Sequence, residues 1–356
     1  MRTVSIFSGC GGSDLGAHRA GAEIVYALDK YSLAIETYRR HKDQLAAPDA
    51  KIVHGDIATV DKLPACELLI GCYPCQSFTM GGKRSPSDHP DSELFLQFQR
   101  ALEISDAKYF VAENVSGLAW LKGGSFLQSH LAAFAGVGKG YKVTYALVNA
   151  RDFGVPADRK RVFIVGVRKD VGEYYWFPPP THGRPGSELE QWASHGDAIA
   201  SLPLDAPGEY YHYEKEPFSW WFMSRNRKRR WEEPGYAITA NWRHVTLHPA
   251  SPTMRLVESN LVDGSKQKWE FTQEHDHLFD KKDRPVLEQP RRLTWRECAI
   301  LQTFPSDFEP AGPVEAKYRQ IGNAVPPALM EKIVSGLIDG TALHDDLPPA
   351  QHGYVV

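Results

Sequence analysis

Long apolar runs and cysteine are both scarce in this chain of 356 residues. No run approaches the ~18 apolar residues that a membrane span requires, and the N-terminus lacks the sustained apolar stretch of a signal peptide. The five cysteines are an odd, sparse set, unlike the dense even set of a secreted disulfide scaffold, so we expect them to be reduced. The sequence therefore predicts a soluble, cytoplasmic protein that does not bind a membrane.

A net positive charge is also missing. The chain carries 41 Lys and Arg against 44 Asp and Glu, a net charge of -3. This balance argues against a wholly basic nucleic-acid coat protein, but it does not exclude a local basic face. The hydrophobic fraction of 42% and the charged fraction of 24% are those of an ordinary globular protein. A chain of this length is expected to form about two domains.

Short apolar runs alternate with helical patterns along the first half of the chain. This alternation predicts an α/β fold in which a doubly wound, mostly parallel sheet carries helices on both faces. Ligands of such sheets bind at the carboxyl ends of the strands. The predicted strands are TVSIF (3–7), EIVYAL (23–28), KIVHGDI (51–57), ELLIG (67–71), KYFVAENV (108–115), YKVTYALVNA (141–150) and RVFIVGV (161–167).

The composition changes after Lys169, where the chain becomes rich in proline, glycine and aromatic residues and loses its helical period. We interpret this part as a smaller, irregular, β-rich domain. Regular secondary structure is expected again from Arg291. TWRE has the Thr-x-x-Glu pattern of a capping box, and NAVPPALMEKIVSGLI predicts a helix. The expected divisions are a first domain at 1–169, completed by the C-terminal helix near 323–339, a second domain at 170–290, a return segment at 291–343 and a tail at 344–356.

Glycines follow the first predicted strand in FSGCGGSDLG, where they allow the backbone to approach a ligand closely. The turn lacks the Lys-Ser/Thr of a phosphate loop and the G-x-G-x-x-G spacing, so its ligand need not carry a pyrophosphate. Asp29 closes the second strand and Asp56 follows the third, where carboxylates suit the ribose hydroxyls and the amine of an adenosine. Each acid taken singly is better explained as a helix cap, whereas three strand ends in succession that suit an adenosine favour a ligand site.

The loop GCYPCQSFTMGGKR places Cys75 directly behind Pro74. A free thiol is mostly protonated at neutral pH, so a nucleophilic cysteine needs help, and Lys83 and Arg84 are nearby cations. Cys72 and Cys75 also form a C-x-x-C, but the sequence has no second such pair for a zinc site. A nucleophile, a structural cysteine and a metal or redox site all remain open at this point.

Charged residues mark two further strands. Glu113 in AENV has apolar neighbours, which would raise its pKa and let it donate a proton, although a solvated acid at a strand end is equally common. Arg159 and Arg161 alternate on one face of a strand, where they suit an anion or a carbonyl oxygen. A salt-bridged strand entrance is the alternative.

The motifs FSGCGG, PCQ, ENV, R-K-R and IGNAVPP, in this order, resemble the DNA cytosine-5 methyltransferase family of bacterial restriction-modification type. The resemblance covers residues 3–168 and 291–338. It implies a Rossmann-like methyltransferase fold with a target-recognition domain, acting in the bacterial cytoplasm or nucleoid. It also implies S-adenosylmethionine as cofactor, S-adenosylhomocysteine as product and no metal.

The same resemblance implies a mechanism and a set of site residues. Cys75 would add to C6 of a flipped-out cytosine, Glu113 would hold N3 and the exocyclic amine, and Arg161 would contact O2. The implied catalytic residues are Cys75, Glu113, Asn114, Arg159 and Arg161. The implied cofactor contacts are Phe7, Ser8, Gly9, Gly11, Gly12, Asp29, Asp56, Ile57, Pro74, Leu94, Asn323 and Ala324. The chain departs from the family at Tyr73, which replaces a proline, at Ala157, which replaces a glutamine, and at Ser92 and Glu93, which replace arginine and glycine.

The segment 220–255 interleaves basic residues with tryptophans and is similar to target domains that read short G/C-rich palindromes such as GGCC. We expect arginines there to contact guanine edges and lysine to contact phosphate, with a solvated basic surface as the alternative. The expected DNA contacts are Gln76, Ser77, Lys83, Arg84, Arg225, Arg227, Lys228 and Arg243. We expect a monomer that binds double-stranded DNA, with a restriction or defence system as candidate partner.

Two other functions stay open from the sequence. A tRNA cytosine-5 methyltransferase of the same family usually has a shorter, differently composed insert. A non-enzymatic DNA-binding protein, or a zinc or redox module built on Cys72 and Cys75, would transfer no methyl group.

Overall fold

The structure is a computed structural model that describes residues 1–73, 94–210, 218–260, 266–272, 284, 286–350 and 354–355. Its contacts divide the chain into two units. The first unit comprises Met1–Gly154, Arg159–Gln191 and Ala324–Val356, and the second comprises Val155–Asp158 and Trp192–Asn323.

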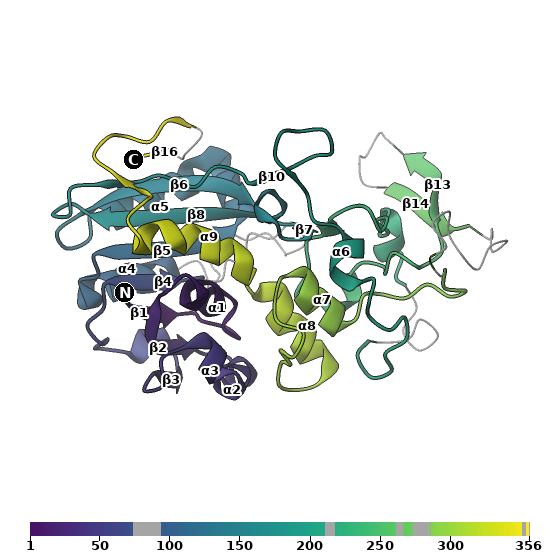
Figure 1. Cartoon of the computed structure of the whole chain (residues 1–356), viewed down its shortest axis with the longest axis horizontal. Coiled ribbons are helices and arrows are strands. Elements are labelled where there is room, and N and C mark those ends of the chain that lie inside the picture. The colour runs from purple at the N-terminus through teal and green to yellow at the C-terminus, as the bar shows by residue number, and fades with distance from the viewer. Residues whose placement is uncertain are drawn as a thin grey trace. The chain divides into compact units, whose positions relative to one another are not determined.

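An eight-stranded sheet forms the centre of the first unit (Figure 1). In spatial order its strands are β16 (Tyr354–Val355), β6 (Tyr141–Asn149), β8 (Lys160–Arg168), β5 (Tyr109–Val115), β4 (Leu68–Gly71), β1 (Arg2–Ile6), β2 (Glu23–Asp29) and β3 (Lys51–His54). The five strands from β5 to β3 pair in parallel, whereas β8 is antiparallel to both β5 and β6. This topology confirms the predicted doubly wound, mostly parallel, Rossmann-like sheet.

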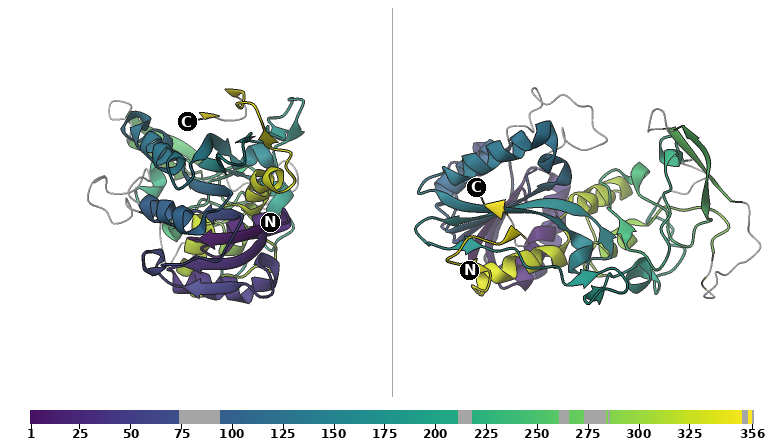
Figure 2. Two further views of the ribbon diagram at one scale, coloured as in Figure 1. Left: turned by 90° about the vertical axis from the view of Figure 1, so that its left-hand side faces the viewer. Right: turned by 90° about the horizontal axis from the view of Figure 1, so that it is seen from above.

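Helices cover both faces of the sheet (Figure 2). On one face α4 (Leu94–Ser105) and α5 (Ser125–Ala135) bury an aromatic core, in which the rings of Phe98 and Phe134 meet edge to face at 5.3 Å. On the other face lie α1 (Gly12–Arg19) and α9 (Pro327–Ile338). These two helices approach so closely that a Cβ on Gly16 would lie 2.2 Å from the Pro327 carbonyl oxygen, so glycine is required there.

Shorter elements complete the first unit. They are α2 (Ser32–Arg40), α3 (Lys42–Leu45), η1 (Ile57–Thr59), η4 (Ser116–Ala119), η5 (Leu121–Gly124), η6 (Ala150–Phe153), β9 (Tyr174–Tyr175), β10 (His182–Gly183), β11 (Glu190–Gln191) and β15 (Leu343–His344). Within the described residues, no helix is both long enough and apolar enough to cross a membrane.

The second unit is irregular, as the composition predicts. Its elements are β7 (Ala157–Asp158), α6 (His195–Ile199), η7 (Phe222–Ser224), β12 (Gly235–Tyr236), η8 (Trp242–His244), β13 (Met254–Asn260), β14 (Lys266–Phe271), α7 (Trp295–Leu301) and α8 (Val314–Asn323). The capping box predicted in TWRE is confirmed at the start of α7, where Thr294 Oγ1 accepts from the Glu297 amide at 3.0 Å and Glu297 Oε2 accepts from the Thr294 amide at 2.8 Å.

The contacts place the unit boundaries differently from the composition. Residues 170–191 belong to the first unit, where the Tyr175 hydroxyl donates to the Ile333 carbonyl of α9 at 2.7 Å. Residues 291–323 belong to the second unit, where the Arg291 guanidinium pairs with both oxygens of Glu297 at 2.7 and 2.8 Å. A change in composition marks where regular structure stops, whereas buried hydrogen bonds decide which residues pack together.

Candidate active site

The chain reverses its winding direction at β1. It runs from β1 to β2 and β3 on one side, then returns to β4 and β5 on the other side. Ligands of such sheets bind at this switch point, outside the carboxyl ends of the strands. The glycine turn after β1, Asp29 at the end of β2 and Glu113 near the end of β5 all lie at this edge.

The glycine turn is fixed to the end of β2. The amide of Gly9 donates to Asp29 Oδ2 at 2.8 Å, and the amide of Tyr31 donates to Asp29 Oδ1 at 2.7 Å. Phe7, Gly9 and Gly11 have positive φ values of 55°, 55° and 93°. These hydrogen bonds orient the Asp29 carboxylate, and the left-handed turn brings the backbone to the edge of the sheet.

Room for a ligand exists next to this turn. A Cβ on Gly9 would meet nothing within 4 Å, whereas a Cβ on Gly11 would lie 2.7 Å from Leu45 Cδ1. The Ser8 hydroxyl is buried, and within the described residues it has no hydrogen-bond partner. A buried hydroxyl is rarely left unsatisfied, so the turn offers an unused polar atom beside open space. Gly12, the first residue of α1, is buried behind it.

The buried carboxylate of Asp14 supports the glycine turn after β1. Asp14 accepts hydrogen bonds from Ser5 Oγ at 2.7 Å, Ser13 Oγ at 2.9 Å and the Tyr38 hydroxyl at 2.7 Å. Burial raises the pKa of Asp14, and the three hydrogen bonds lower it. Sequence reasoning missed this residue, although an acid two residues after the glycines and a serine inside an apolar strand were visible signals.

Asp56 is the N-cap of η1, so the capping interpretation of this acid is confirmed. Its Oδ1 accepts from the Ala58 amide at 3.0 Å, and its Oδ2 accepts from Lys30 Nζ at 2.7 Å. The hydrogen bond from Lys30 lowers the pKa of Asp56. Next to it, Ile57 is buried and its carbonyl accepts from Arg100 of α4.

The remaining predicted cofactor residues lie in different places. Leu94 is the first residue of α4 and packs against the aromatic core. Asn323 ends α8 in the second unit, whereas Ala324 belongs to the first unit. The Ala324 carbonyl accepts from Arg159 Nη2 at 2.8 Å, which links the chain before α9 to β8. Pro74 lies outside the described residues.

Glu113 forms a buried ion pair with Arg161. Arg161 Nε lies 3.0 Å from Glu113 Oε1, on the antiparallel strands β8 and β5. Glu113 is 7% exposed, which excludes the solvated acid that the sequence left open. Burial raises the pKa of Glu113, while Arg161 and Arg159 lower it. Arg159 is only 1% exposed. The site thus holds one carboxylate paired with Arg161 and influenced by the charge of Arg159.

Asn114 holds the backbone that leads to Cys75. Its Nδ2 donates to the Tyr73 carbonyl at 3.1 Å, and its Oδ1 accepts from the Val115 amide at 2.9 Å. Asn114 was expected among the catalytic residues. Both ends of its amide are bonded to backbone, so its side chain restrains the Tyr73 carbonyl.

The surroundings of Cys72 disfavour its thiolate form. Burial raises its pKa well above the ordinary value, and the charges of Glu113 and Asp14 raise it further. A thiol that stays protonated is a poor nucleophile and a poor metal ligand. Among the described residues no cluster of three or more His, Cys, Asp or Glu could hold a metal ion. Six predicted residues lie outside the described part of the chain: Pro74, Cys75, Gln76, Ser77, Lys83 and Arg84.

The predicted DNA-reading arginines differ in exposure. Arg225 and Arg243 are exposed, and their guanidinium groups lie over the rings of Trp221 and Trp242 at 5.7 and 5.0 Å. Arg227 is 9% exposed, and its Nε and Nη2 donate to backbone carbonyls at 3.0 and 3.3 Å. The direction of the Arg227 guanidinium is therefore fixed from within the second unit.

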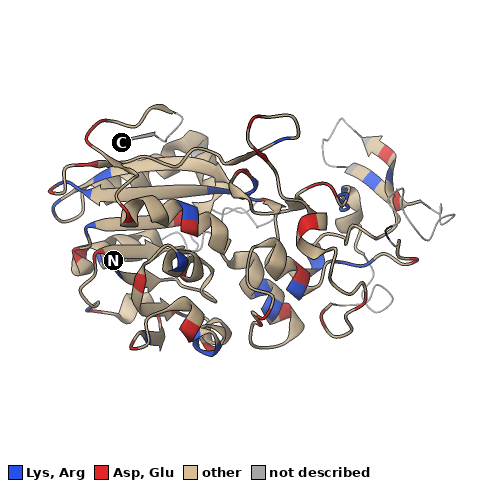
Figure 3. Cartoon of the chain, viewed as in Figure 1, with Lys and Arg blue, Asp and Glu red and all other residues tan. Residues whose placement is uncertain are grey.

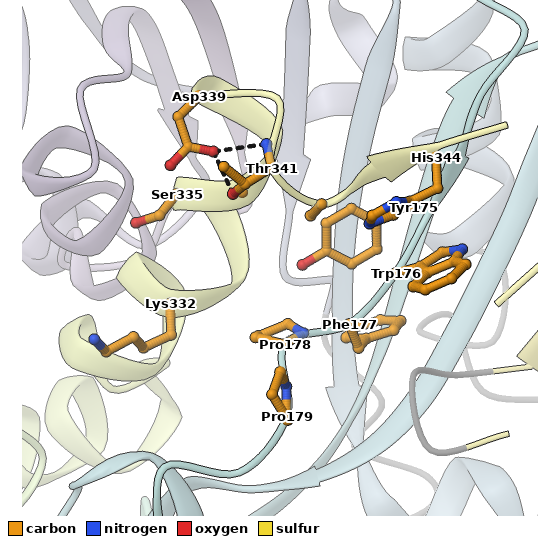
Figure 4. Close-up of a pocket in the computed structure, with 12 residues that line it drawn as sticks. Tyr175, Trp176, Phe177, Pro178, Pro179, Lys332, Ser335, Asp339, Thr341 and His344 are labelled. Carbon is orange, nitrogen blue, oxygen red and sulfur yellow. Dashed lines mark hydrogen bonds between the residues drawn. The ribbon is translucent and has the colours of Figure 1, made fainter. Parts of the chain in front are cut away.

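Neither the distribution of charged residues nor the position of the pocket identifies the candidate active site. Basic and acidic residues are interspersed over the ribbon rather than gathered on one element (Figure 3). Lys228 is half-buried. A pocket of about 270 Å³ lies at the C-terminal end of α9, lined by Trp176, Pro178 and Asp339 among others (Figure 4). This pocket includes no predicted site residue, so the candidate site is defined by the strand ends.

Comparisons with known proteins agree on one family. The model of the family described as C-5 cytosine-specific DNA methylase matches residues 1–339. The Type II methyltransferase M.BsuRI of Bacillus subtilis is 34% identical over 94% of this chain and 78% of its own length, and M.FnuDI of Fusobacterium nucleatum is 34% identical over 92% and 91%. The crystal structure of S. pombe Dnmt2 methyltransferase has the same fold, with a TM-score of 0.61 at 20% identity over 96% of this chain and 99% of that one.

Proposed function

The chain belongs to the C-5 cytosine-specific DNA methylase family, and from this membership we propose that it methylates a flipped-out cytosine through a covalent bond between Cys75 and C6. It is a DNA cytosine-5 methyltransferase, as the sequence predicted, and its named relatives are Type II methyltransferases. The tRNA alternative is not favoured, because the family model and the named Type II relatives are those of DNA methylases. The observation that carries the proposal is the buried ion pair of Glu113 with Arg161.

The glycine turn fits the adenosine-bearing cofactor that the family implies. Open space beside Gly9, the unused Ser8 hydroxyl and the oriented Asp29 carboxylate supply a close backbone approach, a polar contact and an acceptor for ribose hydroxyls. When bound there, S-adenosylmethionine supplies the methyl group that C5 accepts. The Asp56 carboxylate already accepts hydrogen bonds from Lys30 and the Ala58 amide. It would accept a further hydrogen bond from the bound cofactor.

The buried carboxylate suits the proton chemistry of the reaction. Cytosine C5 is a poor nucleophile, and bond formation between Cys75 Sγ and C6 moves electron density to C5. Burial raises the pKa of Glu113, so Glu113 can donate a proton to N3 while negative charge develops on the cytosine ring. Arg161 and Arg159 would stabilise charge on O2. After C5 has accepted the methyl group, loss of the C5 proton allows Cys75 to leave and restores the aromatic ring.

The second unit would read the DNA sequence. We propose a short G/C-rich palindrome such as GGCC as the site, because arginine paired with guanine O6 and N7 is the commonest base-specific contact. Arg225 and Arg243 are exposed, and Arg227 is preorganised by its two carbonyl bonds. Lys228 would contact phosphate. We further propose that the enzyme acts as a monomer beside a restriction or defence partner.

Transfer of labelled methyl groups tests the reaction. Wild-type protein and Cys75→Ser are incubated with labelled S-adenosylmethionine and with unmethylated genomic DNA or total tRNA, and the DNA is sequenced after bisulfite treatment. We expect conversion-resistant cytosines within one short motif with wild type and none with Cys75→Ser. Labelling of tRNA alone would contradict the DNA substrate, and full activity of Cys75→Ser would contradict the covalent mechanism.

A further inference from the structure

Tyr73 and His130 form a buried polar contact next to the catalytic segment. The Tyr73 hydroxyl lies 3.0 Å from His130 Nδ1, and the two side chains are 3% and 1% exposed. Tyr73 stands two residues before Cys75 in the sequence, at a position where the family resemblance expects proline. Proline would restrict the backbone there through its ring. In this chain the restriction at residue 73 must come from side-chain contacts instead.

His130 also contacts the other flank of the same segment. The ring of Phe95, the second residue of α4, stacks on the His130 ring with centroids 4.1 Å apart and planes at 18°. Phe126, on the same helix as His130, packs against the ring at 4.7 Å. Tyr73 and Phe95 are separated by 21 residues that include Cys75, and both contact one side chain on α5.

We propose that His130 is a positioning residue for Cys75, because it fixes the two chain segments that flank residues 74–93 to one point on α5. The inference rests on the proposed role of Cys75 as nucleophile. Asn114 holds the Tyr73 carbonyl at 3.1 Å, so residue 73 is restrained by its backbone as well as by its hydroxyl. Reaction rates depend steeply on such placement, since a displacement of about 1 Å can cost ~100-fold in rate.

Stability alone does not explain a histidine at this position. The ring lies among Tyr73, Phe95, Phe126 and Phe134, a surrounding that would suit phenylalanine. Within the described residues His130 Nε2 has no hydrogen-bond partner, which carries an energetic penalty that an apolar side chain avoids. Burial lowers the pKa of His130 to about 4, so the ring is neutral at physiological pH and the contact with Tyr73 persists there.

Four variants separate the two contacts of His130. His130→Phe keeps the ring for stacking on Phe95 but removes the hydrogen bond, and His130→Asn keeps an amide near Nδ1 but removes the ring. Tyr73→Phe removes the hydrogen bond from the other side, and the fourth variant combines Tyr73→Phe with His130→Phe. Leu131→Ala is the control. Leu131 is a buried, apolar neighbour of His130 on α5, so truncating it leaves a cavity and lowers stability without removing a polar contact.

The assay measures kcat, the KM for duplex DNA, the Kd for S-adenosylmethionine and the Tm of each variant. We expect Tyr73→Phe and His130→Phe each to lower kcat about tenfold, with KM and Kd changed less than about twofold, and the double variant to be no slower than either single variant. His130→Asn should fall between wild type and His130→Phe. Leu131→Ala should lower Tm more than His130→Phe does and keep kcat within about twofold of wild type.

Unchanged kcat in His130→Phe, additive losses in the double variant, or a loss of kcat that merely follows Tm as in Leu131→Ala would overturn the inference. A duplex with 5-fluorocytosine at the methylated position separates this failure from failure of the proposed function. After methyl transfer from added S-adenosylmethionine, C5 of this base carries fluorine where the normal base carries the proton that is lost, and fluorine cannot leave as a cation, so Cys75 of wild type should stay covalently bound to C6. If wild type forms no adduct, the covalent mechanism is wrong and the inference falls with it.

Discussion

Replacement of Glu113 by glutamine separates its charge from its shape. Gln has nearly the same volume and keeps an oxygen that can accept from Arg161, but it cannot carry the negative charge or donate a carboxylic proton. In the wild type this single carboxylate is buried beside Arg161 at 3.0 Å and within the field of Arg159. Glu113→Gln therefore removes the negative charge that faces Arg161 and Arg159.

Two magnitudes follow from this arrangement. The effect on stability is small: burial favours the neutral form of Glu113, and the neutral amide mimics that form, so the variant should lose little free energy of unfolding at neutral pH. Losing a positioned proton donor lowers kcat by about 10²–10⁴. Because a domain is stable by only about 5–15 kcal/mol, the variant should still fold at 25 °C, and the loss of kcat can be measured on folded protein.

Glu67→Gln is the matched control for this substitution. Glu67 is an exposed carboxylate 3.8 Å from Lys108, so the same chemical change should alter the free energy of unfolding by less than about 1 kcal/mol. Urea unfolding and methyl-transfer kinetics are measured for both variants. Wild-type kcat in Glu113→Gln would refute the assigned role of the buried carboxylate, and the Glu67→Gln control shows how much the same chemical change costs at an unrelated site.

The pH dependence gives an independent check on Glu113. Its pKa is raised in the folded protein, so between the unfolded pKa near 4.5 and the raised value the native state binds more protons than the unfolded state. The stability of wild type should therefore fall, relative to Glu113→Gln, as pH rises through this window. The proton-donating form is lost over the same rise, so the alkaline limb of kcat that belongs to Glu113 should be absent in Glu113→Gln. An unchanged limb would show that another group produces it.

Three further substitutions test the cofactor turn and the second unit. Gly11→Ala places a Cβ 2.7 Å from Leu45 at a φ of 93°, so it should lower the free energy of unfolding by about 2 kcal/mol or more in denaturant titrations. Asp29→Asn removes the charge and one of the two acceptors that hold the Gly9 and Tyr31 amides, so calorimetry should show a Kd for S-adenosylmethionine raised about tenfold, together with a lower Tm. Arg225→Ala should cost about 1–3 kcal/mol of discrimination at one base pair, seen as relaxed specificity in bisulfite sequencing, whereas a uniform loss across sequences would indicate a phosphate contact.

Much of the fold could be predicted because its signals are local in the sequence. Apolar runs ending in polar residues gave a parallel sheet with its ligands at the strand ends, and the capping box in TWRE begins α7 at the expected residue. The unit boundaries were less predictable. Tyr175 and Ile333 are 158 residues apart, and no composition change announces their hydrogen bond.

The sequence by itself determined the family and the order of its motifs, because catalysis requires particular residue types at each strand end. Only the tertiary structure decided that Glu113 is buried against Arg161, that Asp56 caps a helix and that Asn114 donates to the Tyr73 carbonyl. It also brought His130 to Tyr73 across 57 residues. The period of apolar residues in a sequence shows which face of a strand or helix is buried. The protonation and role of a side chain depend on its burial and hydrogen bonds. Those depend in turn on partners that only folding brings together.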